Sequence, residues 1–179
     1  TDLSTGAARL VRSTEIMDDP LHAEIDDAIK RGKSKAVNTD AGEVFIAIHL
    51  PSPRMVLIGA VHISQALVPM AKLAGFDVTI IDPRSAFATP ERFRDVRLIA
   101  EWPEDVLHEI SFDQWTAFAA LTHDPKIDDE PLMAALKAEC FYIGALGSTR
   151  THAKRVAALS DAGLSEDVIA RIDGPVGAD

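Results

Sequence analysis

The sequence lacks the features that define several classes of protein. It contains one cysteine, Cys140, so it cannot form an internal disulfide or a zinc cluster built on cysteines. None of its apolar runs approaches the roughly 20 residues that a membrane-spanning helix needs. It does not open with the charged and then apolar pattern of a signal peptide, which predicts a cytoplasmic protein.

The sequence also lacks an excess of positive charge. It has 18 Lys and Arg residues against 28 Asp and Glu residues, which gives a formal net charge of −10. Nucleic-acid binding depends on clustered cations, so the charge balance argues against nucleic acid as the main partner. The 179 residues are 47% hydrophobic and 26% charged, which is typical of one globular domain, with or without a small appendage.

Two regions of different pattern are predicted, with a boundary at the linker Pro51-Ser52-Pro53. Residues 1–50 are expected to form a small α+β appendage, and residues 54–179 a larger domain. In the appendage, Asp19 is placed to cap a helix that begins at Pro20. The predicted elements of the appendage are this helix, ending near Gly32, and strands at 36–39 and 43–49.

After the linker, strands and helices alternate. The continuous apolar run 54–58 is typical of a strand buried on both faces of a parallel sheet. The alternation predicts a doubly wound, Rossmann-type α/β sheet, in which ligands bind beyond the carboxyl ends of the strands. The further predicted strands are 77–81, 96–100, 115–121 and 141–146, and the predicted helices are 62–74, 103–110, 131–138, 149–162 and 165–172.

The first two strand ends partly match a dinucleotide-binding turn. Gly59 fits the first glycine of G-x-G-x-x-G, and Asp82 follows at a suitable distance to bind a ribose hydroxyl. However, Val61 replaces the second glycine, which normally lets the backbone approach a pyrophosphate. Two interpretations therefore stay open: NAD(P) binding, or a tight turn in which Gly59 has only a structural role.

The fifth strand end predicts an anion site. Gly147 and Ser148 lead into a helix whose first turn contains Arg150, Thr151 and His152. Helix N-termini bind anions through free N–H groups, and an arginine can form a bidentate contact with phosphate. The alternative is a helix capped by hydroxyl groups on the protein surface, with solvated cations.

Histidines and aspartates at the strand ends give weaker signals. His62, His123 and His152 fit a metal site or acid–base groups, but each also fits an ordinary hydrogen-bonded histidine, and no metal is predicted. Asp124 and Asp128 fit a pair of catalytic carboxylates, but capping of the following helix explains them equally well.

Taken together, the strand ends resemble the XdhC/CoxI family of xanthine dehydrogenase accessory factors. Residues 174–177, GPVG, also resemble that family, whose pattern continues beyond Asp179. The chain begins with Thr1 rather than Met, which adds the expectation of a missing or processed N-terminus. The runs that carry the resemblance are LIGAVH at 57–62, VTIIDPR at 78–84, LTHDPK at 121–126, FYIGALGS at 141–148 and RTHAKR at 150–155.

The resemblance implies a non-catalytic maturation factor that binds molybdenum cofactor and helps to insert it into a molybdenum hydroxylase, such as xanthine or carbon monoxide dehydrogenase. It also implies a homodimer, and it makes residues 1–50 part of the family's N-terminal domain. On this interpretation the anion is held by Ser148, Arg150, Thr151 and His152 beside Gly147, the pterin or a ribose is contacted by Asp82 and Arg84, and the pocket is lined by His62 and His123.

Two other functions remain as alternatives. A nicotinamide-dependent oxidoreductase would need room for a pyrophosphate at Gly59 to Val61, and Asp82 would favour NAD over NADP. A hydrolase or metal enzyme would use His62, His123 and Asp124, which lack the spacing of any recognisable ligand set or triad.

Overall fold

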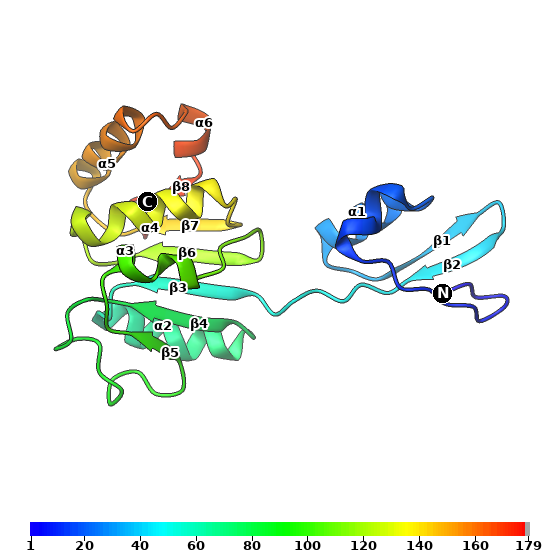
Figure 1. Ribbon diagram of the computed structural model, residues 1–179, viewed down its shortest axis with the longest axis horizontal. Coiled ribbons are helices and arrows are strands. Elements are labelled where there is room, and N and C mark those ends of the chain that lie inside the picture. Colours follow the sequence, from blue (N-terminus) through cyan, green and yellow to red (C-terminus); the bar gives the residue numbers. More distant parts are fainter. Residues whose placement is uncertain (178–179) are drawn as a thin grey trace. The chain divides into compact units, whose positions relative to one another are not determined.

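The computed structural model describes residues 1–177 and divides the chain into two compact units, Thr1–Pro51 and Ser52–Asp179 (Figure 1). Each unit has its own buried apolar cluster. Among the described residues, no helix has the length and apolar character required to cross a membrane.

The first unit is a helix packed on a β-hairpin. Ile25 and Ala28 of the helix are buried against Ile46 of the hairpin. Asp19 does not occupy the N-cap position as predicted, because the chain makes a turn first and Leu21 becomes the N-cap. Its buried carboxylate instead accepts the Leu21 N–H. The elements are η1 (Ser13–Asp18), α1 (His22–Arg31), β1 (Lys35–Thr39) and β2 (Gly42–Ile46).

The second unit is a six-stranded sheet in the order β5-β4-β3-β6-β7-β8, with all neighbours parallel. Counted from β3, this is the Rossmann strand order. The prediction of a doubly wound parallel sheet with a small α+β appendage is confirmed. The elements are β3 (Arg54–Ile58), α2 (His62–Leu73), β4 (Asp77–Ile81), β5 (Arg97–Ile99), α3 (Pro103–Val106), η2 (Leu107–Glu109), β6 (Thr116–Ala120), α4 (Pro125–Lys137), β7 (Tyr142–Ala145), α5 (Thr149–Asp161), α6 (Glu166–Ile169) and β8 (Ile172–Asp173).

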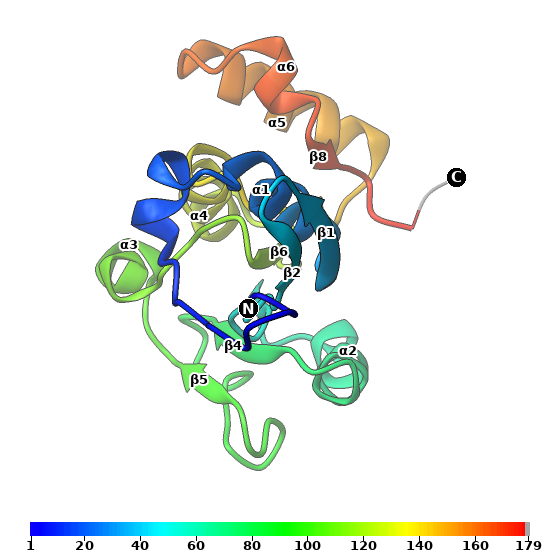
Figure 2. The same ribbon diagram turned by 90° about the vertical axis from the view of Figure 1, so that its right-hand side faces the viewer.

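Helices cover both faces of this sheet, with α2 on one face and α3 and α4 on the other (Figure 2). Successive strand residues point to opposite faces, so Leu57 joins the cluster under α2 while Val56 and Ile58 join the cluster under α4. Burial on both faces explains why β3 is a continuous apolar run rather than an alternating one.

Three predicted helices have clearly different bounds in the structure. The predicted helix 103–110 is divided into α3 and the 3-10 turn η2. Helix α4 begins at Pro125 rather than at residue 131, because Asp124 caps it by accepting the Lys126 N–H at 3.0 Å. Pro131 lies inside that helix. The predicted helix 165–172 is wrong at its end, where Ile172 begins β8 and pairs with Ile143 of β7. A strand of two residues has no periodicity that a sequence pattern can reveal.

Candidate functional site

The carboxyl ends of β3 and β6 form the switch point of the sheet, where ligands bind in this type of fold. The turn after β3 packs closely against the turn after β6. Gly59 has a φ of +116°, and a Cβ at this position would lie 2.9 Å from Thr122 Cγ2. Both its conformation and its close approach therefore require glycine, and they do so without any ligand.

Asp82, at the end of β4, is completely buried and bonded within the chain. Its Oδ2 accepts the Ala60 N–H at 2.7 Å and Arg84 Nη2 at 2.7 Å, and its Oδ1 accepts Arg84 Nε at 2.8 Å. Burial alone would raise the pKa of Asp82, but the bonds from Arg84 and Ala60 hold that pKa below its ordinary value. A ribose hydroxyl would have to displace one of these internal donors.

Arg84 follows the end of β4 and is bonded to Asp82. Its guanidinium lies over the Phe87 ring, 4.7 Å from the centroid. Its bond to Asp82 is the main cause of a raised Arg84 pKa, and the charges of Asp128 and Asp124 raise it further. Its side chain is 35% exposed, so it is a cation within reach of a ligand at the switch point.

The end of β6 presents His123. Its backbone has a φ of +66°, a conformation that residues other than glycine rarely adopt. The side chain is exposed, and its Nδ1 lies 3.8 Å from the point where a Cβ on Gly147 would be. The structure therefore brings His123 of the β6 end beside Gly147 of the β7 end, as the sequence predicts for neighbouring parallel strands.

Asp124 and Asp128 follow His123 but do not form a free pair of carboxylates. Asp124 caps α4. Asp128 is fully buried, and burial raises its pKa even though it accepts hydrogen bonds from Thr122 and from the His123 N–H. The capping interpretation therefore holds for Asp124, and Asp128 has a third role that neither interpretation included.

Helix α5 begins at Thr149, two residues after Gly147. Ser148 caps it by accepting the Thr151 N–H at 3.1 Å, and the two side-chain oxygens lie 3.0 Å apart. The first helical residues, Thr149 and Arg150, carry amide groups that helix geometry leaves without partners inside the helix. Arg150 is exposed and stands at this positive end of the helix dipole.

The other two histidines lie on different helices, His62 on α2 and His152 on α5. His62 begins α2 and is exposed, with its Nδ1 3.2 Å from Gln65 Oε1. His152 packs against Gly174, where a Cβ would lie 2.5 Å from the imidazole Nδ1. Burial and the nearby Arg155 charge lower the pKa of His152, which favours a neutral ring and a packing role over an anion contact.

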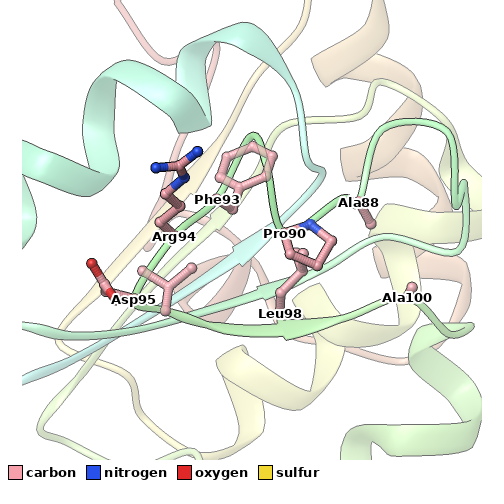
Figure 3. A pocket seen from close by; sticks show the side chains of 8 residues that line it. Ala88, Pro90, Phe93, Arg94, Asp95, Leu98 and Ala100 are labelled. Carbon is pink, nitrogen blue, oxygen red and sulfur yellow. The ribbon is translucent and has the colours of Figure 1, made fainter.

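Among residues 1–177, no three His, Cys, Asp or Glu side chains are grouped so that they could hold a metal ion. An open hollow of about 650 Å³ lies beside the edge strand β5, and none of the predicted site residues lines it (Figure 3). It is lined mainly by apolar side chains, including Ala88, Pro90, Phe93 and Leu98.

Sequence reasoning identified the strand ends but missed one connection between them. Arg155 of α5 is buried, and its Nη2 lies 3.7 Å from Asp128 Oδ2 of α4. Because the two residues are far apart in the sequence and on different helices, no spacing pattern links them. The one available signal is that Arg155 lies four residues before Leu159, on the same face of α5 as that buried side chain.

Comparison with known proteins gives a consistent result. The sequence profile of the XdhC Rossmann domain matches residues 55–179. The uncharacterized protein YqeB of Escherichia coli K12 is 31% identical over 157 residues, covering 82% of this chain. The molybdenum cofactor insertion chaperone PaoD, also of Escherichia coli K12, is 32% identical over 127 residues, covering 71% of this chain.

A solved structure shares the fold. A crystal structure of a xanthine dehydrogenase from Bacillus halodurans is 28% identical, with a TM-score of 0.60, and the match covers 72% of this chain and 37% of that chain. This chain spans only 28% of the length of YqeB and 34% of the length of PaoD. The family profile does not reach residues 1–50, so their assignment to the family's N-terminal domain stays a prediction.

Proposed function

The chain belongs to the XdhC family, and on that premise we propose that it is a maturation factor for a molybdenum hydroxylase. It binds molybdenum cofactor as cargo and passes it to an apo-enzyme such as xanthine or carbon monoxide dehydrogenase. The name of PaoD supports the cargo, and the name of the Bacillus halodurans structure supports this class of client. The homodimer expected from the resemblance stays a prediction.

The observation that carries the proposal is the contact between the ends of β6 and β7. It places the exposed His123 beside Gly147 and the N-terminus of α5. In this proposal the phosphate of the cofactor binds to the first amides of α5 and to Arg150. The polar pterin lies over the strand ends, where His123 and Arg84 are its hydrogen-bonding neighbours.

The residues present fit such a cargo. A pterin carrying phosphate needs an anion site and a few polar side chains, and the strand ends supply a helix N-terminus, the exposed Arg150, the partly exposed Arg84 and the imidazole of His123. When bound, the cofactor brings its molybdenum on its own dithiolene sulfurs. The chain is therefore required to bind and shield the pterin rather than to supply metal ligands.

The alternative of an NAD(P)-dependent oxidoreductase receives no such support. Asp82, the acid that would bind the ribose, is buried and bonded to Arg84 and Ala60. Gly59 is explained by its packing against Thr122. Val61 occupies the N-cap of α2, where a dinucleotide turn uses small residues close to the pyrophosphate.

The experiment that tests the function identifies the ligand that the protein carries. The protein is produced in a host that makes molybdenum cofactor and is purified without oxygen. The released ligand is then oxidised, and fluorescent pterin is quantified per chain. We expect pterin and no NAD by mass spectrometry, whereas NAD without pterin would contradict the proposal.

A further inference from the structure

Asp128 holds the end of β6 in place. Its side chain is fully buried, and both carboxylate oxygens are used. Oδ1 accepts the Thr122 hydroxyl at 2.7 Å, and Oδ2 accepts the His123 N–H at 3.0 Å. The two residues that it holds are the last two before Asp124, the cap of α4.

The bond to His123 matters because of the backbone conformation of that residue. With a φ of +66°, His123 is in the left-handed region, which non-glycine residues occupy only when their surroundings hold them there. The hydrogen bond from the His123 N–H to Asp128 fixes the orientation of the peptide group between Thr122 and His123. The conformation in turn decides where the exposed imidazole stands relative to Gly147.

Arg155 extends this network to the next strand end. Its side chain is 4% exposed, and its Nη2 lies 3.7 Å from Asp128 Oδ2 and 3.5 Å from the Leu146 carbonyl oxygen. Leu146 immediately precedes Gly147 in the loop between β7 and α5. One buried ion pair therefore contacts both loops that border the candidate site.

Capping does not explain this arrangement, because Asp124 already caps α4. Core filling does not explain it either, since an apolar pair of similar size would avoid the cost of burying two charges. We propose that Asp128 is a positioning residue of the candidate site: it fixes His123 and, through Arg155, holds the end of β6 against the β7–α5 loop. The expected effect of Asp128 on pterin binding rests on the proposed function, whereas its effect on the conformation of His123 does not.

The test compares the variant Asp128→Ala, the double variant Asp128→Ala/Arg155→Met and the control Leu132→Ala. Leu132 is fully buried in the same helix but has no place in the network, so its truncation lowers stability alone. Two readouts are taken on each protein. The first is the NMR signature of His123, from its amide protection and its Cα and Cβ shifts, and the second is pterin per chain.

We expect Asp128→Ala to lose the left-handed signature of His123 and to carry about tenfold less pterin, as expected when a contacting group is misplaced. The double variant lacks the buried guanidinium that Asp128→Ala leaves unpaired, so it should be more stable than Asp128→Ala. It should still show neither the left-handed NMR signature of His123 nor wild-type pterin content. Leu132→Ala keeps both. If the Asp128→Ala protein does not fold, the double variant provides the same comparison.

Two results would overturn the proposal. One is a normal His123 signature without Asp128, and the other is an equal loss of both readouts in Leu132→Ala, which would make Asp128 merely structural. Absence of pterin from the wild-type protein would instead contradict the proposed function. In that case the His123 signature alone still decides whether Asp128 positions that residue.

Discussion

Arg84 Nη2 donates to Asp82 Oδ2 at 2.7 Å, and the same carboxylate oxygen accepts the Ala60 N–H at the start of the β3–α2 loop. This carboxylate therefore joins the end of β4 to the turn after β3. It does so from a fully buried position. In this protein the acid that spacing assigns to a ribose is part of the scaffold of the switch point.

The first prediction concerns the stability that Asp82 provides. Asp82→Asn removes charge-assisted hydrogen bonds and should lower the free energy of unfolding by about 2 kcal/mol at neutral pH. The measurement is urea unfolding followed by tryptophan fluorescence, because Trp102 and Trp115, the two tryptophans, both lie in the second unit. Arg84→Gln leaves the fully buried carboxylate without its cation, so it should lower the free energy of unfolding at neutral pH by at least as much.

The same variant gives a prediction for pH. The folded-state pKa of Asp82 lies below its ordinary value, so its contribution is complete above that ordinary value and is lost as pH falls through the folded-state pKa. The stability difference between wild type and Asp82→Asn should therefore be constant near neutral pH and shrink in acid. A difference that grows in acid would contradict this assignment.

The next prediction concerns Gly59. Gly59→Ala places a Cβ 2.9 Å from Thr122 Cγ2 at a positive φ, so it should destabilise the second unit by about 2 kcal/mol or more. Gly75→Ala is the control, because Gly75 also has a positive φ but nothing within 4 Å of its Cβ position. Gly75→Ala should lower the free energy of unfolding by less than Gly59→Ala does.

Thr122→Ser distinguishes the contact from the backbone strain at Gly59. It removes Cγ2 but keeps the hydroxyl that donates to Asp128. Combined with Gly59→Ala, it should recover part of the lost stability in urea unfolding. If it recovers none, the close approach to Thr122 is not the reason for glycine at this position.

The strands of the sheet could be predicted from the sequence, but the hydrogen bonds among the buried polar side chains at the strand ends could not. The strands 54–58 and 77–81 coincide with β3 and β4. In β3, burial on both faces leaves a continuous apolar run, whereas β4 is recognised by the β-branched residues that follow Asp77. The convergence of strand ends follows from parallel topology alone. That Asp82 bonds to Arg84, and Asp128 to Thr122 and His123, depends on side-chain directions across turns, which spacing does not specify.

The missed strand β8 leads to a further prediction. Tyr142 is the only tyrosine, and its hydroxyl donates to Asp173 Oδ2 of β8 at 2.8 Å. Burial, with the Asp173 contact, raises the pKa of Tyr142 to about 12. Tyrosinate absorbance should therefore titrate near that pH in the folded protein, and Asp173→Asn should lower the midpoint while burial keeps it above the ordinary value.

The sign of the linked stability follows from this shift. A phenol whose folded-state pKa is raised stabilises the fold below its ordinary pKa, and that contribution is lost as pH rises toward 12. Wild type should thus lose stability in alkali more steeply than Asp173→Asn. Titration of Tyr142 at the ordinary pKa of a tyrosine in the folded protein would contradict the contact between Tyr142 and Asp173.

The central claim, that a pterin phosphate binds at the N-terminus of α5, is tested most directly by pterin content in matched variants. Arg150→Ala removes the exposed cation in the first turn of α5, and Lys154→Ala removes an exposed cation from the same helix one turn later. All three proteins are produced with molybdenum cofactor and purified without oxygen. We predict near-stoichiometric pterin in wild type and Lys154→Ala, and a loss of about tenfold in Arg150→Ala. Equal pterin in wild type and Arg150→Ala would contradict the site, and no pterin in the wild-type protein would contradict the function.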